Sequence, residues 1–97
     1  MPSQLISVDF EVFGKVQGVS FRKYTEKQAK KLNLRGWCMN TKAGTVTGNL
    51  EGPQQKVEEM KQWLQMEGSP QSRIEKAEFK NERILDKFSH KEFSIRQ

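Results

Sequence analysis

The sequence is poor in residues that crosslink a chain, bind transition metals or cross a membrane. Among 97 residues there is one cysteine, Cys38, and one histidine, His90. A single cysteine excludes an intrachain disulfide, so the composition gives no support to an oxidising compartment. No stretch approaches the ~20 apolar residues of a membrane-spanning helix, and the N-terminal residues lack the basic and apolar regions of a secretory signal. We therefore expect a cytoplasmic protein with no membrane partner.

The length and the charge set further limits. A chain of 97 residues buries too little surface to divide its core, so we expect a single domain over residues 1–97. Lysine and arginine number 17 against 12 aspartate and glutamate, which gives a net charge of +5. This excess favours anionic partners, but the charge alone does not distinguish a phosphorylated small molecule from nucleic acid or an acidic membrane.

Hydrophobic periodicity predicts strands and helices in alternation. Apolar residues at Ile6, Val8, Phe10 and Val12 alternate with polar ones, which is typical of a half-buried strand. Helical spacing follows from Phe21, and a proline at position 53 suits the first position of a second helix. In chain order the expected elements are a strand at 6–12, a helix at 21–32, strands at 36–40 and 45–51, a helix at 53–67, a strand at 74–81 and a short strand at 93–95.

The order strand, helix, strand, strand, helix, strand is that of a ferredoxin-like α+β fold. We therefore expect a βαββαβ sandwich, in which an antiparallel sheet carries two helices on one face. Because this fold hosts many activities, the function has to come from particular residues.

The segment between the first strand and the first helix contains two glycines, Gly14 and Gly18. Glycine adopts backbone conformations that let successive N–H groups converge on an anion, and the helix N-terminus adds partial positive charge. Arg22, just inside the helix, could bind phosphate oxygens through two parallel hydrogen bonds. An ordinary strand-to-helix turn has the same pattern. The candidate phosphate-binding loop comprises Gly14, Lys15, Val16, Gln17, Gly18, Val19, Ser20, Phe21 and Arg22.

Two segments together resemble a known family. V-F-G-K-V-Q-G-V-S-F-R, residues 12–22, and G-W-C-M-N-T-K-A-G-T-V-T-G-N-L-E-G, residues 36–52, are similar to the two signatures of the acylphosphatases, in particular the small vertebrate-like common and muscle types. Ser20 occupies a variable site of the first signature, so the isoform stays open.

The resemblance implies a hydrolase that cleaves the carboxyl-phosphate anhydride of small acyl phosphates into carboxylate and inorganic phosphate. It implies direct attack by water, without metal or cofactor. Arg22 and the loop amides would bind the phosphate, and the Asn40 side chain would orient the water. Thr41 and Gly44 would shape the hairpin that presents Asn40, although simple turn chemistry explains both equally well.

The residue types fit this chemistry. A departing carboxylate needs no proton, so the demands on the protein are in-line positioning and charge stabilisation. The position that holds the nucleophilic cysteine in tyrosine phosphatase loops is Val16 here, which argues against a covalent route. The only histidine and the only cysteine lie outside the loop, and no spacing of His, Cys and carboxylates resembles a metal site. Our hypothesis is that the water passes its proton to the substrate phosphate.

Two rival functions deserve a test. An RNA-recognition module has the same element order, but it needs aromatic residues on its central strands. Residues 45–51 contain none, and Asp9 and Glu11 on the first strand would repel a phosphodiester backbone. We therefore expect no nucleic-acid partner and a monomeric protein. A catalytically silent phosphate sensor would keep the same loop, so binding features alone do not separate it from an enzyme.

Overall fold

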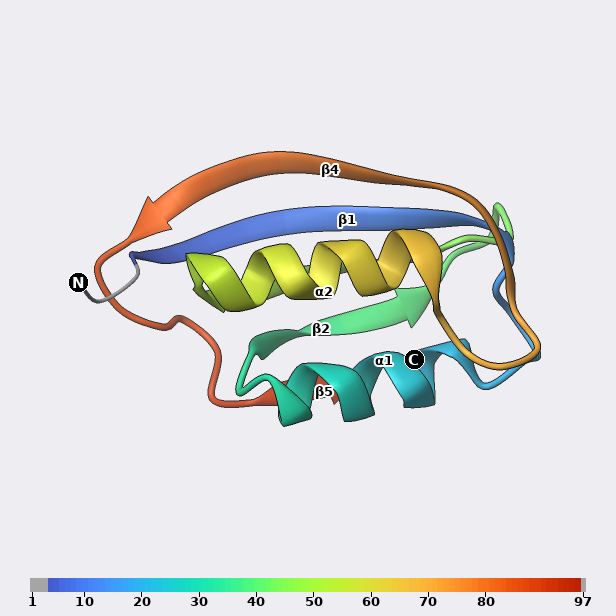
Figure 1. The fold of residues 1–97 in the computed structure, drawn as a ribbon, viewed down its shortest axis with the longest axis horizontal. Coiled ribbons are helices and arrows are strands. Elements are labelled where there is room, and N and C mark those ends of the chain that lie inside the picture. The colour runs from blue at the N-terminus through green and yellow to red at the C-terminus, as the bar shows by residue number, and fades with distance from the viewer. Residues whose placement is uncertain (1–3, 97) are drawn as a thin grey trace.

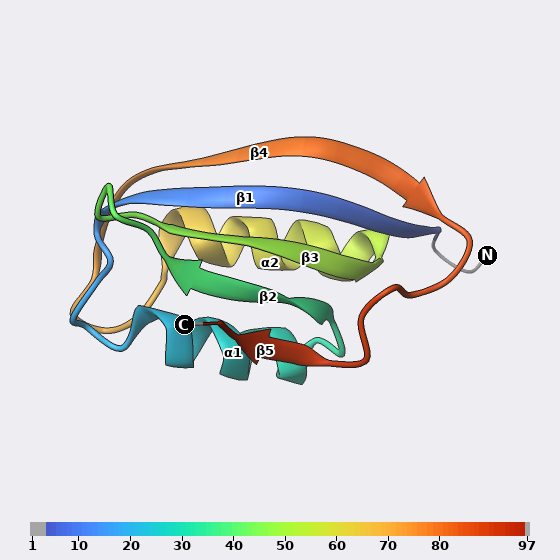
Figure 2. The ribbon, with the colours of Figure 1, turned by 180° about the vertical axis from the view of Figure 1, so that it is seen from behind.

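The computed structural model describes residues 4–96. Two helices pack on one face of a five-stranded sheet whose strand order is β4-β1-β3-β2-β5, as the two opposite views show (Figure 1, Figure 2). The ferredoxin-like α+β prediction is confirmed. Within the described residues, no helix is long and apolar enough to cross a bilayer. The elements are β1 (Leu5–Lys15), α1 (Phe21–Lys31), β2 (Arg35–Asn40), β3 (Val46–Pro53), α2 (Gln54–Met66), β4 (Arg73–Leu85) and β5 (Phe93–Ile95).

The sheet differs from the prediction at one edge. Four strands pair antiparallel as expected, but β5 pairs parallel with β2, so the sheet is mixed. The chain returns along the outside of β2 after β4, and the Arg96 amide donates to the Cys38 carbonyl at 2.8 Å. Element boundaries also moved: Gly14 and Lys15 belong to β1, Pro53 ends β3 and caps α2 instead of starting it, and β4 continues to Leu85, beyond the expected residue 81.

The core lies between the sheet and the helices. Alternate side chains of β1, from Ile6 to Val12, are buried there. The rings of Phe21 in α1 and Trp63 in α2 lie 5.9 Å apart between centroids, so the two helices share one apolar layer. The other buried helix residues are Thr25, Ala29, Val57, Met60 and Leu64.

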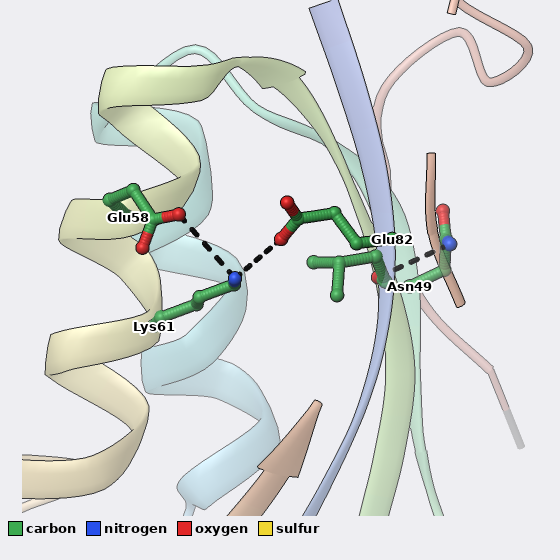
Figure 3. A network of polar contacts seen from close by, with 5 residues as sticks. Asn49, Glu58, Lys61 and Glu82 are labelled. Atoms are coloured by element: carbon green, nitrogen blue, oxygen red, sulfur yellow. Dashed lines mark hydrogen bonds and ion pairs between the residues drawn. The ribbon is translucent and has the colours of Figure 1, made fainter. Parts of the chain in front are cut away.

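A charged contact fastens α2 to the edge strand β4. The Lys61 ammonium lies 2.6 Å from a Glu82 carboxylate oxygen and 3.5 Å from one of Glu58 (Figure 3). Burial lowers the pKa of Lys61, but its hydrogen bond to Glu82 and the negative charges of Glu58 and Glu82 outweigh this effect, so the pKa is raised above its usual value. Asn49 lies on the other face of the sheet in the same view and donates to the Val8 carbonyl.

The packing of Phe93 generates a stability prediction. Phe93 is 1% exposed and is the only fully buried residue of β5, whereas Ile84 on β4 is 66% exposed. Replacing Phe93 with alanine should cost about 3–5 kcal/mol because it leaves a cavity in the core. Ile84→Ala, the matched control, should change the unfolding free energy by less than about 0.5 kcal/mol. Urea unfolding measures both, and similar midpoints for the two variants would contradict the placement of β5.

Cys38 generates a second prediction. Its side chain is fully buried under α1, and burial raises the pKa of the thiol to about 12 despite the nearby Arg22. Because the thiolate is the reactive form, iodoacetamide should modify the folded protein very slowly at neutral pH and the urea-unfolded protein rapidly. Mass spectrometry of the alkylated chain measures both rates. Equal rates in the two states would show that the thiol is exposed.

Candidate active site

The loop after β1, the start of α1 and the β2–β3 hairpin meet at one end of the sheet, on the right in Figure 1 and on the left in Figure 2. A cavity of about 490 Å³ opens there. It brings together segments that are up to 79 residues apart in the sequence, from Val16 to Ile95. The residues that line it are Val16, Gly18, Ser20, Phe21, Arg22, Lys23, Asn40 and Ile95.

The loop backbone leaves its N–H groups without partners. Gly18 and Ser20 both adopt left-handed conformations, with φ of 74° and 59°. Ser20 stands at the N-cap of α1, yet its side chain makes no capping hydrogen bond. Residues 4–96 offer no acceptor to the amides of residues 17–22. These amides, together with the positive end of the α1 dipole, form a group of donors suited to a phosphate.

Side chains of the same loop anchor it to the core. Val16 and Phe21 are each 1% exposed, and Val19 is 8% exposed. Their side chains therefore pack in the core, and only their backbone groups can contact a ligand. Burial of these three side chains fixes the path of the backbone around the cavity.

Arg22 supplies the positive charge. It is the second residue of α1, and its Nη1 lies 3.5 Å from the Arg96 carbonyl oxygen just beyond β5. No carboxylate among residues 4–96 forms an ion pair with this guanidinium. Most of its five donors are thus available to an anion in the cavity.

Asn40 faces the same cavity from the end of β2. Its Oδ1 atom is buried and receives no hydrogen bond from any described residue. An unpaired buried acceptor costs about 1–3 kcal/mol, so natural proteins seldom retain one without a ligand or water to satisfy it. A residue of the cavity wall therefore carries an unused hydrogen-bond acceptor.

Gln17 connects the loop to the hairpin. Its Nε2 donates to the carbonyl oxygens of Thr41 and Thr45, both at 2.9 Å. The hydroxyls of these threonines lie 2.7 Å apart, and that of Thr45 donates to the Glu11 carboxylate. The loop amides and Asn40 are thus held at a fixed separation.

Several predicted site residues lie outside the cavity. Gly14 and Lys15 pair with Ile74 and Arg73 in the sheet, and a side chain at Gly14 would collide with the Arg73 carbonyl. Gln17 and Val19 do not line the cavity either. Thr41 and Gly44 form the hairpin turn, in which the Gly44 amide donates to the Thr41 carbonyl at 3.2 Å.

Two residues that line the cavity were missed from the sequence. Lys23 directly follows Arg22, and its position in the first turn of α1 was a usable signal. Ile95 gave no signal, because only the parallel pairing of β5 with β2 brings it to the site.

Comparison with known proteins identifies the family. A family model described as Acylphosphatase matches residues 8–95. Acylphosphatase-1 of Xenopus laevis is 63% identical over 92 residues, which cover 95% of this chain and 93% of that protein. Acylphosphatase-2 of Mus musculus is 56% identical over 96 residues, which cover 99% of this chain and 91% of that protein.

The fold agrees with a solved structure of the same kind. The crystal structure of acylphosphatase from Bacillus subtilis matches with a TM-score of 0.86 at 32% sequence identity, covering 95% of this chain and 99% of that one. The resemblance noted in residues 12–22 and 36–52 is thereby confirmed over nearly the whole chain. This chain belongs to the acylphosphatase family, whose members are hydrolases acting on acid anhydrides.

Proposed function

We propose that this protein hydrolyses the carboxyl-phosphate anhydride of small acyl phosphates by direct attack of water on phosphorus, without metal or cofactor. The observation that carries the proposal is one cavity lined by loop residues with unpaired amides, by Arg22 and by Asn40, whose Oδ1 is unsatisfied. Membership of the acylphosphatase family supplies the reaction class.

The loop and Arg22 bind the phosphoryl group. Amides of residues 17–22 donate to its oxygens, and the guanidinium neutralises much of its charge. These donors are fixed before the substrate arrives, so no reorganisation is needed when charge shifts in the transition state. In a loose transition state, the equatorial oxygens carry the charge that such donors stabilise.

Asn40 orients the nucleophile. Its Oδ1 accepts a hydrogen bond from the water, which turns a lone pair of the water oxygen toward phosphorus. The carboxamide is no base, so the proton passes to a phosphoryl oxygen as the new bond forms. The carboxylate leaves as a weak base and takes no proton from the protein.

Neither the cysteine nor the histidine of this sequence is a suitable nucleophile for a phosphorylated protein intermediate. The Cys38 thiol is buried, donates to the Arg22 carbonyl and has a raised pKa, so it is a poor nucleophile. His90 lies in the connection between β4 and β5, where its amide donates to Glu51. That glutamate lies near the end of β3 remote from the hairpin.

The remaining expectations join the proposal. We propose that residues 1–97 act as one acylphosphatase-like domain and that the protein is a cytoplasmic monomer without nucleic-acid partners. Size-exclusion chromatography with light scattering tests the monomer, and cell fractionation tests the location. Salt-sensitive retention on a nucleic-acid column, without acyl phosphate turnover, would favour the RNA-binding alternative.

The reaction can be tested in one assay. Purified protein should hydrolyse benzoyl phosphate at the same rate with and without EDTA, because no step uses a metal. In water enriched with heavy oxygen, the label should enter inorganic phosphate and not benzoate, since attack is on phosphorus. Phosphate binding without any turnover would instead identify a silent sensor, and label in benzoate would show attack at carbon.

The division of roles predicts different kinetics for two variants. Arg22→Ala should lower kcat/KM by about 100-fold or more (~3 kcal/mol), raise KM and weaken inhibition by inorganic phosphate, because the guanidinium contacts phosphate in both states. Asn40→Ala should lower kcat by about 100-fold with little change in phosphate inhibition, since it removes a contact to the water. Lys31→Ala, at the exposed end of α1, is the control. Equal weakening of phosphate inhibition by Arg22→Ala and Asn40→Ala would refute this division.

A further inference from the structure

A second hollow adjoins the candidate active site along α1. It has a volume of about 280 Å³ and is lined by Ser20, Lys23, Tyr24 and Lys27, a set called the α1 groove below. Ser20 and Lys23 also line the catalytic cavity, so the two hollows share a wall. Tyr24 is 40% exposed, which is unusual among the large apolar side chains of this protein. A ligand held in the cavity could therefore extend into the groove and contact an aromatic ring.

The groove carries positive charge without a counter-charge. Lys23 and Lys27 are four positions apart on α1, so their side chains are neighbours on one helix face. Like charges at this spacing destabilise a helix slightly. Neither lysine forms an ion pair within residues 4–96, whereas Lys30 on the same helix lies 3.5 Å from Glu26. The charge arrangement of the groove is thus unfavourable for the free protein and favourable for a bound anion.

The α1 groove is a place for the acyl group that is compatible with the geometry of the reaction. Attacking and leaving oxygens lie on opposite sides of phosphorus in an in-line displacement. Asn40, which orients the water, lines the catalytic cavity but not the groove. The acyl group has to leave on the side of the phosphoryl group away from Asn40, and a group that lies in the α1 groove would not occupy the wall that Asn40 forms.

We propose that the α1 groove is an acyl-side subsite that favours acyl phosphates whose acyl portion carries a second anionic group. Tyr24 packs against the carbon skeleton of the acyl group, and Lys27, with Lys23, binds the anion at its far end. This inference rests on the proposed function, because it assumes that the phosphoryl group occupies the loop. It makes Tyr24 and Lys27 specificity-determining residues that act on the leaving group.

Two substrates that differ only in the second anion test the subsite. The ratio of kcat/KM for para-carboxybenzoyl phosphate to that for benzoyl phosphate, each divided by its uncatalysed rate, should be about three in the wild type, a typical effect of an exposed ion pair. Lys27→Gln should bring the ratio close to one, and added salt should reduce it in the wild type. Tyr24→Ala should lower kcat/KM for both aromatic substrates relative to acetyl phosphate.

Lys30→Gln is the matched control, because it removes the same charge from the same helix outside the groove. It should leave the ratio at its wild-type value. A wild-type ratio of one, or an equal loss of ratio in Lys27→Gln and Lys30→Gln, would overturn the subsite while leaving the hydrolase intact. Absence of turnover with all three substrates would overturn the proposed function and the subsite together.

Discussion

The carboxamide of Gln17 holds the two halves of the candidate active site together. Both of its N–H donors are used on the hairpin, one on the Thr41 carbonyl and one on the Thr45 carbonyl. The loop itself has little regular hydrogen bonding, since its only internal backbone contact joins the Val16 amide to Gly14. Without a tie across the gap, the loop amides and Asn40 would move independently. Because the Gln17 hydrogen bonds fix the loop relative to the hairpin, folding has already lost much of the entropy that would otherwise be lost when a phosphate and a water are brought together.

The loop also illustrates a division between side chains and backbone. Val16, Val19 and Phe21 bury their side chains, and this packing turns the backbone N–H groups into the chemically useful part of the segment. The N-cap position shows the cost. A capping serine typically contributes about 1 kcal/mol to helix stability, and Ser20 makes no such bond. The first-turn amides of α1 remain available to an anion instead. The protein thus lacks the stabilisation of an N-cap hydrogen bond at a functional site.

The position of β5, which brings Ile95 to the cavity, depends on polar contacts far from the site. Glu51, buried in β3, accepts hydrogen bonds from the amides of Ser89 and His90, both at 3.0 Å, and from the Ser89 hydroxyl. Arg35 stacks on the Phe88 ring at 3.8 Å. Together these contacts hold the connection that leads from β4 into β5. They explain why a strand of only three residues takes a defined position, in which Ile95 reaches the catalytic cavity.

Local pattern by itself determined much of this protein. The alternation from Ile6 to Val12, the helical spacing after Phe21 and the two signature segments gave the order of elements, the fold class and the family. They also singled out Arg22 and Asn40, which line one cavity although 18 positions separate them. Such features depend on residues that are close in the sequence, so they can be recognised from the sequence alone. Tertiary structure alone decided the parallel pairing of β5, the place of Ile95 at the cavity, and the use of Gln17 as a tie. It also showed that Gly14 is needed where β1 passes close to β4 and is not part of the cavity. Each of these depends on contacts between segments distant in the chain, which hydrophobic periodicity and turn propensity do not encode.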